Sequence, residues 1–308
     1  MSTSLTVALC THNHKQRLVR TLPALAQLRA PACPWELLIV DNASTDGTSD
    51  LLSENHWRGP DMKVRVVQEK KLGLSNARNR AIREAAGEYI VFMDDDETPH
   101  PDWLRAYERL ILAERPDALG GRIEVMFEDG ERPPWLQDEL LGFLGQLDHG
   151  HGACRLVDPA TPIFGGNFAF RKEVFARIGT FDAGLGRKGA VNVGGEDTEM
   201  FRRMVRGGCN VWWAPDAVIH HRIQAVKLRR SYFLDLHFRQ GHTEGVRRRG
   251  DASRIPPAYF FPQLLRAIRT ALSDRFRRGR NASLRKEMNV AYFIGHLYGW
   301  AFGSYRGK

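Results

Sequence analysis

The feature that most constrains the fold is an alternation of short apolar runs and helical patterns over residues 1–100. Apolar, β-branched runs begin near residues 5, 35, 64 and 89, and each has the length of a buried strand. Helical patterns separate them, and the strongest, 74–86, is followed by Gly87, where a C-terminal glycine cap is expected. Connections of this kind are right-handed crossovers, so the sequence predicts an α/β fold with a mostly parallel, Rossmann-like sheet flanked by helices.

The fourth apolar run ends in three consecutive aspartates. Tyr89–Met93 form the run, and Asp94, Asp95 and Asp96 follow it directly. Carboxylates at the end of such a strand lie at the carboxyl edge of the sheet, where α/β proteins bind ligands. Three adjacent acids repel one another, so a divalent cation such as Mn²⁺ or Mg²⁺ is expected among them, with phosphates completing its shell. A solvated acidic loop is the alternative.

Two further polar elements are expected at the same edge. Asp41 ends the second run, and a polar turn, Thr11–His14, follows the first. With the acidic triplet they make a pocket suited to a nucleoside diphosphate, in which one acid takes a base N–H, another the ribose hydroxyls and a third the metal. The sequence contains no Gly-x-x-x-x-Gly-Lys-Ser and no Gly-x-Gly-x-x-Gly motif, so no glycine loop is expected to cradle the phosphates.

Asp197 is the candidate general base. It lies in the first turn of a predicted helix, just after two glycines. A carboxylate there can cap the helix, which is the more common role, or it can deprotonate an acceptor hydroxyl as that hydroxyl attacks an activated carbon. The neighbouring Glu196 and the upstream Gly166 and Asn167 favour the catalytic interpretation.

Two other segments are expected near this site. Residues 128–152, which include Trp135, are rich in Gly, Pro and Asp, and they are expected to form a long loop or lid on the active-site side. His220 and His221 end a strand-like segment, after an expected strand at 209–213. Either histidine could be a metal ligand or an ordinary surface residue.

Five stretches together resemble glycosyltransferase family 2, whose members are inverting enzymes of the GT-A fold. They are residues 7–13, 39–48, 73–79, 87–96 and 195–199, and the resemblance covers about residues 5–222. It implies transfer of a sugar from a nucleotide-diphosphate-sugar, with a UDP-sugar favoured, to a hydroxyl acceptor. That acceptor would be a glycan, a lipid-linked molecule or a small molecule, in the synthesis of cell-surface polysaccharides or glycoconjugates.

The resemblance also implies roles for individual residues. The donor nucleotide would contact Thr11, His12, Asn13, Asp41, Arg78, Asp94 and Asp95. A divalent metal would bind Asp96 and His221, and Asp197 would be the general base. The acceptor side would include Trp135, Gly166, Asn167 and Glu196. His12 replaces the tyrosine more common in the family, and the third aspartate leaves the ribose contact open between Asp94 and Asp95.

The charge is divided unevenly along the chain. Residues 222–308 carry 19 basic and 5 acidic side chains, a net charge of +14, whereas the remainder carries 26 basic and 31 acidic side chains, a net charge of −5. We therefore expect a catalytic domain over 1–222, with a donor half to about 100 and an acceptor half from 101, and a mainly helical basic extension over 223–308. Residues 260–280 fit a basic amphipathic helix that either lies on an anionic membrane surface or packs on the catalytic domain.

Several classes of function and location fit the sequence poorly. A nucleotidyltransferase would be expected to carry a glycine-rich, basic loop after the first strand, and a basic membrane- or nucleic-acid-binding module would not need the acids. No nucleic-acid motif accompanies the basic residues, so no nucleic-acid partner is expected. The N-terminus lacks a signal-peptide pattern and no apolar run is long enough to span a membrane. The four cysteines lack a paired pattern, so we expect a cytoplasmic protein, free or peripheral on the inner face of the membrane.

Overall fold

The computed structural model describes residues 3–54, 56–59, 62–128, 131–186, 195–249, 256–279 and 282–303. The chain forms two compact units. The first, here called the sheet unit, comprises Met1–Met126 and Gly145–Arg222. The second, the helical unit, comprises Phe127–Leu144 and Ile223–Lys308. The break at Arg222 coincides with the change in net charge, but Phe127–Leu144, which the sequence suggested was part of the catalytic domain, belongs to the helical unit.

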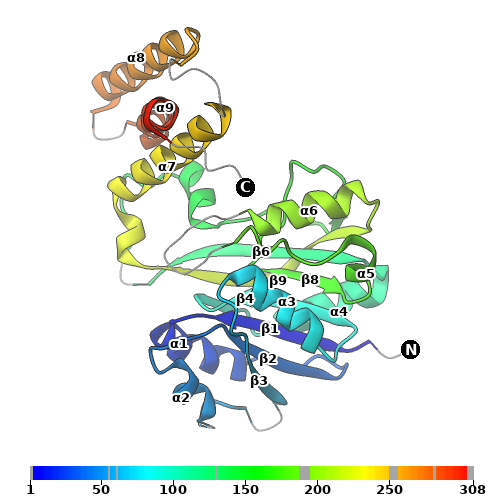
Figure 1. Cartoon of the computed structure of the whole chain (residues 1–308). Helices are drawn as coiled ribbons and strands as arrows, with labels where there is room; N and C mark the ends of the chain where they lie inside the picture. The colour runs from blue at the N-terminus through cyan, green and yellow to red at the C-terminus, as the bar shows by residue number, and fades with distance from the viewer. Residues whose placement is uncertain are drawn as a thin grey trace. The chain divides into compact units, whose positions relative to one another are not determined.

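Four parallel strands form one half of the sheet, in the spatial order β3-β2-β1-β4 (Figure 1). They are β1 Leu5–Thr11, β2 Trp35–Asp41, β3 Val64–Gln68 and β4 Tyr89–Asp94. The register places Thr11 beside Asp41 and Cys10 beside Asp94. The polar ends of β1, β2 and β4 therefore meet at one edge of the sheet, which confirms the arrangement expected from the crossover rules.

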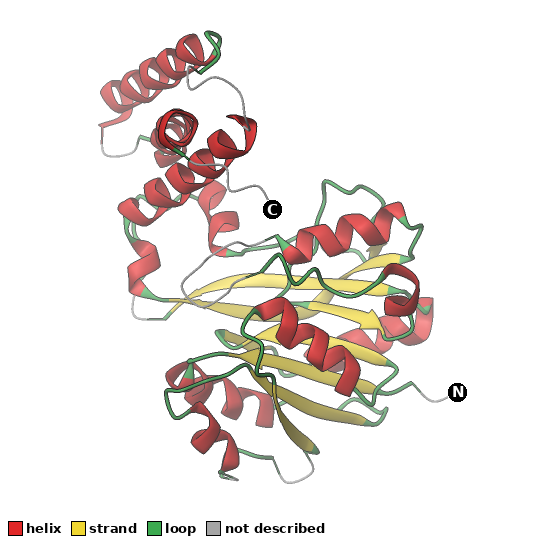
Figure 2. Cartoon of the chain, viewed as in Figure 1, coloured by secondary structure: helices red, strands yellow, loops and turns green. Residues whose placement is uncertain are grey.

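The other half of the sheet is antiparallel, so the sheet is mixed rather than mostly parallel (Figure 2). Strand β8 is antiparallel to both β4 and β6, and β9 is antiparallel to both β5 and β7. The expected strand at 209–213 begins at Val211 and is longer than predicted, because it continues through Pro215 and the histidine pair. The bounds are β5 Glu97–Pro99, β6 Ala118–Phe127, β7 Cys154–Arg155, β8 Phe168–Arg171 and β9 Val211–Ile223.

Helices pack against both halves of this sheet and bury its apolar strands (Figure 1). Helix α3 ends at Glu84, before the predicted end, and Gly87 is not its cap. A Cβ atom at Gly87 would lie 2.6 Å from the backbone of Leu5 and Thr6, so the glycine allows two chain segments to approach closely. The helices are α1 Lys15–Ala26, α2 Thr48–Ser53, α3 Leu74–Glu84, α4 Trp103–Glu114, α5 Val174–Ile178 and α6 Glu196–Arg206.

The helical unit is built around two helices, α7 Arg230–Arg249 and α9 Leu284–Phe302, which contact each other through glycines. A Cβ atom at Gly245 would overlap the carbonyl oxygen of His296, and one at Gly299 would overlap that of His242. Helix-to-helix contact this close is possible only where the side chain is absent. The elements are the 3₁₀ helices η1 Asp138–Leu144 and η2 Ala225–Leu228, and the helices α7 Arg230–Arg249, α8 Phe260–Arg278 and α9 Leu284–Phe302.

The expected loop at 128–152 is therefore partly helical, and its first part packs within the helical unit. Trp135 meets Phe233 edge to face, with ring centroids 5.6 Å apart, because the two rings share the apolar interior of that unit. Asp129 and Gly130 of this segment, and Arg280 at the end of the predicted amphipathic span, lie outside the described residues. In the described parts of the chain, no helix combines the length and apolar character needed to cross a membrane.

Candidate functional site

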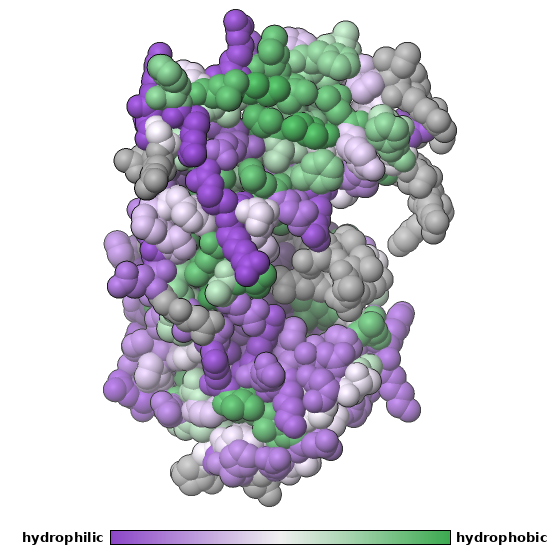
Figure 3. All heavy atoms as spheres, turned by 90° about the vertical axis from the view of Figure 1, so that its left-hand side faces the viewer, coloured by the Kyte–Doolittle hydropathy of each residue, from purple (hydrophilic) through white to green (hydrophobic). Residues whose placement is uncertain are grey.

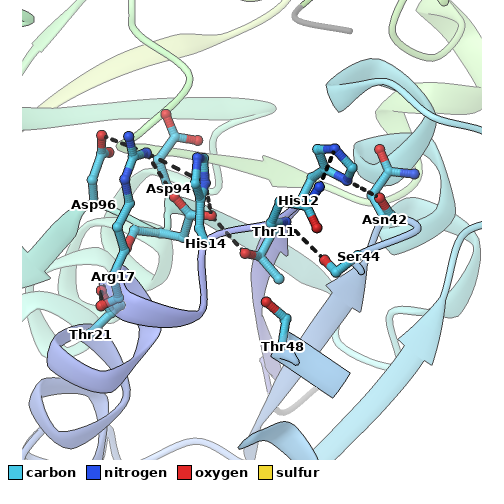
Figure 4. Close-up of polar contacts among 12 residues, drawn as sticks. Thr11, His12, His14, Arg17, Thr21, Asn42, Ser44, Thr48, Asp94 and Asp96 are labelled. Atoms are coloured by element: carbon cyan, nitrogen blue, oxygen red, sulfur yellow. Dashed lines mark hydrogen bonds and ion pairs between the residues drawn. The ribbon is translucent and has the colours of Figure 1, made fainter. Parts of the chain in front are cut away.

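Asp95, the middle residue of the acidic triplet, is turned into the body of the sheet unit. Its carboxylate accepts a hydrogen bond from Thr11 Oγ1 at 2.7 Å and lies 2.7 Å from His14 Nδ1, and the residue is only 6% exposed. Figure 4 shows Thr11 and His14 reaching the triplet from the end of β1 and the turn that follows it. Asp95 is thus a structural anchor for this turn. Asp96 is almost as buried, at 8% exposed.

Asp96 faces both a histidine and an arginine. Its Oδ2 atom lies 3.5 Å from His221 Nε2 and 3.2 Å from Arg17 Nη1, which extends from α1 (Figure 4). His220 points to the other face of β9, where its Nε2 atom lies 3.5 Å from Glu124 Oε2. Successive side chains of a strand point to opposite faces, so His221 alone of this pair approaches the acidic edge.

Asp94 is held by Arg78, one of the most buried side chains of the protein. The guanidinium is 2% exposed and donates from Nη2 to Asp94 Oδ1 at 3.2 Å and from Nη1 to Glu196 Oε1 at 2.9 Å. It also lies over the ring of Phe168, 5.3 Å from the centroid. Arg78 therefore ties β4 to the start of α6. Glu196, expected on the acceptor side, is 5% exposed and is engaged in this ion pair.

Glu97, which the sequence analysis did not consider, lies buried beneath the acidic edge. Its Oε2 atom accepts a hydrogen bond from the backbone N–H of Asp94 at 2.8 Å. Burial, followed by the charges of Asp94 and Asp96, raises the pKa of Glu97 well above its ordinary value, which favours the neutral carboxyl group. A Cβ atom at Gly166 would overlap Glu97 Oε1, so the predicted acceptor-side glycine instead makes room for this carboxyl group. The position of Glu97, directly after the triplet, is the sequence signal that could have identified it.

Asp197 lies partly exposed in the first turn of α6. Its Oδ2 atom accepts a hydrogen bond from the Gly165 backbone N–H at 3.0 Å, and Oδ1 accepts one from the Thr198 N–H at 2.7 Å. The first bond fixes the glycine-rich segment before β8 to α6, and the second stabilises the helix start. Each carboxylate oxygen has more than one lone pair, so both hydrogen bonds leave the group able to accept a proton.

The turn expected to hold the base is formed by the ends of β1 and β2. His12 Nδ1 lies 2.7 Å from the Asn42 carbonyl oxygen (Figure 4). The exposed Asn13 accepts a hydrogen bond from the Thr45 N–H at 2.7 Å. Both side chains are accessible to a ligand at this edge.

Asp41, in contrast, is fully buried and serves the turn itself. Gln68 Nε2 donates to it at 2.9 Å, and the backbone N–H of Ser44 donates at 3.2 Å. Burial opposes its charged form, but hydrogen bonds from Ser44, Ser49 and Gln68 outweigh this effect and lower the pKa of Asp41. A contact between this carboxylate and a base would require it to give up one of these bonds.

One predicted acceptor-side residue, Asn167, is enclosed by the fold. Asn167 is fully buried, and its amide is saturated: the oxygen accepts from Trp103 Nε1 at 2.8 Å and Tyr107 Oη at 2.7 Å, while the nitrogen donates to the Ala217 carbonyl oxygen at 2.7 Å. It therefore holds β6, β8, β9 and α4 together rather than facing a ligand. Trp135 lies in the helical unit.

The arrangement of acids suits a divalent metal only when a substrate completes the shell. Among the described residues, no three His, Cys, Asp or Glu side chains come close enough together to hold a metal by themselves. Asp96 and His221 converge, and the Asp94 side chain is 34% exposed at the same edge. Two carboxylates and an imidazole are suitable ligands for Mn²⁺, and Mg²⁺ is commonly bound by one or two carboxylates plus substrate phosphates.

Two protein-family models match the chain. Residues 6–179 match the model described as glycosyl transferase family 2, and residues 145–228 match one described as the N-terminal domain of galactosyltransferase. The chain is 26% identical to glycosyltransferase AglE of Haloferax volcanii over 70% of this chain and 66% of that protein. It is 23% identical to the succinoglycan biosynthesis protein ExoM of Rhizobium meliloti over 78% of this chain and 73% of that protein.

Solved structures show the same fold. The mannosyltransferase PcManGT of Pyrobaculum calidifontis, in complex with GDP-Man and Mn²⁺, matches with a TM-score of 0.63 and 18% identity, over 97% of this chain and 88% of that chain. S. aureus TarS in complex with UDP-GlcNAc matches with a TM-score of 0.51 and 17% identity, over 76% of this chain and 64% of that chain. At these identities the likeness establishes the fold alone.

Proposed function

The chain belongs to glycosyltransferase family 2, and on this basis we propose that it catalyses inverting, metal-dependent transfer of a sugar from a nucleotide-diphosphate-sugar to a hydroxyl acceptor. A UDP-sugar is the favoured donor, with GDP- and dTDP-sugars as alternatives. TarS and PcManGT, whose structures hold UDP-GlcNAc and GDP-Man, support a nucleotide-sugar donor, and the Mn²⁺ of PcManGT supports a metal. The relationship to ExoM supports a role in polysaccharide or glycoconjugate biosynthesis.

The observation that carries this proposal is the approach of Asp96 to His221 at the carboxyl edge of the sheet, where the partly exposed Asp94 also lies. Asp95 is held by Thr11. The donor diphosphate would lie at this edge. Asp96 and His221 would bind the metal that holds it, and Asp94 would contact the ribose. When bound there, a divalent metal would act as a Lewis acid toward the diphosphate leaving group. The acids are too few to satisfy such an ion alone, which explains why the diphosphate and the metal should bind together.

The residues of the chain control charge and position around this edge. Arg78 fixes Asp94 through a buried ion pair, so that the carboxylate is already oriented when the donor arrives. Glu97, with its raised pKa, adds a hydrogen-bond partner beneath Asp94 without adding a further negative charge. His12 and Asn13 would contact the base, at the open end of the turn.

The transfer itself is a single displacement. The acceptor oxygen attacks the anomeric carbon from the face opposite the diphosphate, and the bond from that carbon to the diphosphate oxygen breaks with its electron pair leaving on the diphosphate. Asp197 accepts the proton that the acceptor hydroxyl loses. One new glycosidic bond thus replaces one sugar–phosphate bond with inversion, and no covalent enzyme intermediate is needed.

The proposal can be tested by nucleotide binding, using the two adjacent histidines as a matched pair. Calorimetry with UDP, GDP and dTDP, each with MnCl₂ and with EDTA, should show one nucleotide that binds tightly only with the metal. His221→Gln should weaken that binding, whereas His220→Gln, which faces the other side of β9, should leave it unchanged. Equal affinity in EDTA would contradict metal dependence. Pyrophosphate release from a nucleoside triphosphate and a sugar phosphate would identify a nucleotidyltransferase instead.

A further inference from the structure

One face of helix α8 is apolar and uncovered. Its members are Phe261, Leu265, Leu272 and Phe276, whose exposed fractions are 53%, 55%, 65% and 93%. At about 100° per residue, the four side chains fall within about 60° of one another around the helix axis, so they share one face. We call this face the apolar stripe. Figure 3 shows hydrophobic residues gathered on the surface of the helical unit, in the upper part of that view.

The stripe is not the face by which α8 packs in its own unit. That face carries Phe260, which stacks on His296 of α9 with ring centroids 4.1 Å apart and meets Phe293 at 5.9 Å. Phe260 is 3% exposed, whereas its neighbour Phe261 is more than half exposed. Helix α8 therefore has two apolar faces, and the helical unit covers one of them.

A cationic groove runs along α8 beside the stripe. It has a volume of about 550 Å³ and is lined by Pro262, Leu265, Arg266, Arg269, Thr270, Ser273, Asp274, Arg277 and Lys286. The Asp274 carboxylate forms an ion pair with Lys286, whose Nζ atom lies 2.6 Å from Asp274 Oδ1. Within the described residues, Arg266, Arg269 and Arg277 form no ion pair. Leu265 belongs to both the stripe and the groove, so the apolar and the cationic surfaces are continuous.

From this combination we propose that α8 docks on an anionic phospholipid bilayer, with the apolar stripe among the acyl chains and the groove arginines on headgroup phosphates. A helix with an apolar face and adjacent arginines is suited to lie in the plane of such an interface. A second copy of the chain is a poorer occupant, because docking two such faces would bring two sets of unpaired arginines together. The proposal goes beyond glycosyl transfer and does not depend on it.

The size of the expected effect follows from the charges. Each basic residue near an anionic membrane surface contributes about 1 kcal/mol, and about 1.4 kcal/mol corresponds to a tenfold change in affinity. Removing the three groove arginines should therefore weaken binding about 100-fold. The contribution of the arginines should also fall as salt is added, because the surface potential is screened.

The experiment measures sedimentation of the full chain with vesicles. Vesicles of phosphatidylcholine alone are compared with vesicles that contain phosphatidylglycerol, at low and high NaCl. One variant removes the arginines (Arg266→Gln, Arg269→Gln, Arg277→Gln) and another the apolar groups (Leu272→Gln, Phe276→Gln). The matched controls lie on the sheet unit: Arg29→Gln, Arg202→Gln and Arg206→Gln for charge, and Val19→Gln with Leu112→Gln for exposed apolar groups.

We expect salt-sensitive binding of the unmodified chain to the anionic vesicles only, with strong loss in both α8 variants and little change in the controls. The melting temperature and turnover on a soluble acceptor should be unchanged in all variants, because every substituted side chain is exposed. Failure of the unmodified chain to prefer anionic vesicles would overturn the proposal without any variant. Equal loss in the sheet-unit controls would also overturn it, as would a dimer that the apolar variant dissociates while vesicle binding persists.

Discussion

Arg78 and Glu196 form an ion pair of 2.9 Å in which the two side chains are 2% and 7% exposed. The same guanidinium contacts Asp94, so a single buried cation joins the end of β4 to the first residue of the helix that carries Asp197. The position of the candidate base relative to the acidic edge therefore depends on Arg78.

We predict that Arg78→Gln destabilises the sheet unit strongly. Removing one partner of a buried ion pair leaves an uncompensated charge and typically costs about 3–5 kcal/mol. Arg78→Lys should not restore full stability, because a single ammonium group cannot replace the two guanidinium nitrogens that contact Asp94 and Glu196. Denaturant unfolding measures the free-energy change. Arg80→Gln is the control. Arg80 pairs with Glu84, the two side chains are 34% and 27% exposed, and the pair should contribute about 1 kcal/mol or less. If Arg78→Gln and Arg80→Gln changed the free energy of unfolding equally, the buried ion pairs of Arg78 would not contribute more than an exposed pair.

Asp197→Asn should reduce turnover by roughly 10²–10⁴-fold, the usual contribution of a general base, while donor binding is unchanged. Glu199→Gln, in the same helical turn and paired with Arg203, is the matched control and should retain activity. Both rates would be measured at saturating donor and neutral pH. Near-normal turnover of the asparagine variant would leave Asp197 as a helix cap and an anchor for Gly165.

Arg17 places a positive charge on Asp96, the proposed metal ligand. Its Nη1 atom is 3.2 Å from Asp96 Oδ2 and 3.4 Å from Asp95 Oδ1. A cation at this distance opposes the binding of another, so Arg17→Gln should tighten Mn²⁺ binding in the absence of nucleotide by about tenfold. Electron paramagnetic resonance of free Mn²⁺ measures this directly. Arg20→Gln, an exposed residue of the same helix, should have a much smaller effect. Unchanged Mn²⁺ affinity in the Arg17 variant would place the ion away from Asp96.

His296 should make the helical unit sensitive to acid. It is 1% exposed, and neither ring nitrogen has a hydrogen-bond partner among the described residues. Burial, reinforced by Arg248 and opposed by Glu244, lowers the pKa of His296 below its ordinary value of 6.5. The unfolded chain therefore binds a proton at a higher pH than the folded chain. The contribution to stability is fully present above about pH 6.5 and is lost as the pH falls through the folded-state pKa.

Hydrogen exchange of α9 peptides at pH 7.5 and 5.5 would test this expectation. Protection should fall at the lower pH in the unmodified chain, after correction for the intrinsic exchange rate. In His296→Phe, whose ring can keep the stack on Phe260, the fall should be smaller. His237 also has a lowered pKa because of burial and should account for some of the remaining pH dependence. An identical fall in both proteins would assign the effect to other groups.

The parallel half of the sheet could be predicted because β1, β2 and β4 are mainly apolar runs that are buried almost throughout, although the edge strand β3 is only partly buried. The antiparallel half was harder to predict. Pro215 divides the pattern of β9, and the strand is recognisable only from its pairing with β5 and β7. The triplet itself was found from the sequence, but the roles of its members were not, because three adjacent acids have the same chemistry until Thr11 and His14 select Asp95 as the anchor.

Burial explains the other differences. Asn167 and Glu97 are polar residues in a glycine-rich or acidic context, and the sequence could not show that the folded chain encloses them. Trp135 is only partly buried, and its position could not be predicted because its partner Phe233 is distant in sequence. Sequence patterns located the site, whereas the assignment of individual side chains required the tertiary contacts.

The glycine contacts between α7 and α9 have a consequence for the order in which the protein is made. Gly245 of α7 packs against α9, and the residues that complete this contact, up to Gly299, are synthesised more than 50 positions later. While α8 is emerging from the ribosome, the glycine face of α7 has no neighbour, and the isolated helix lacks the tertiary packing that gives most helices their stability. The helical unit should therefore fold only after α9 has been released, whereas the parallel half of the sheet can assemble earlier.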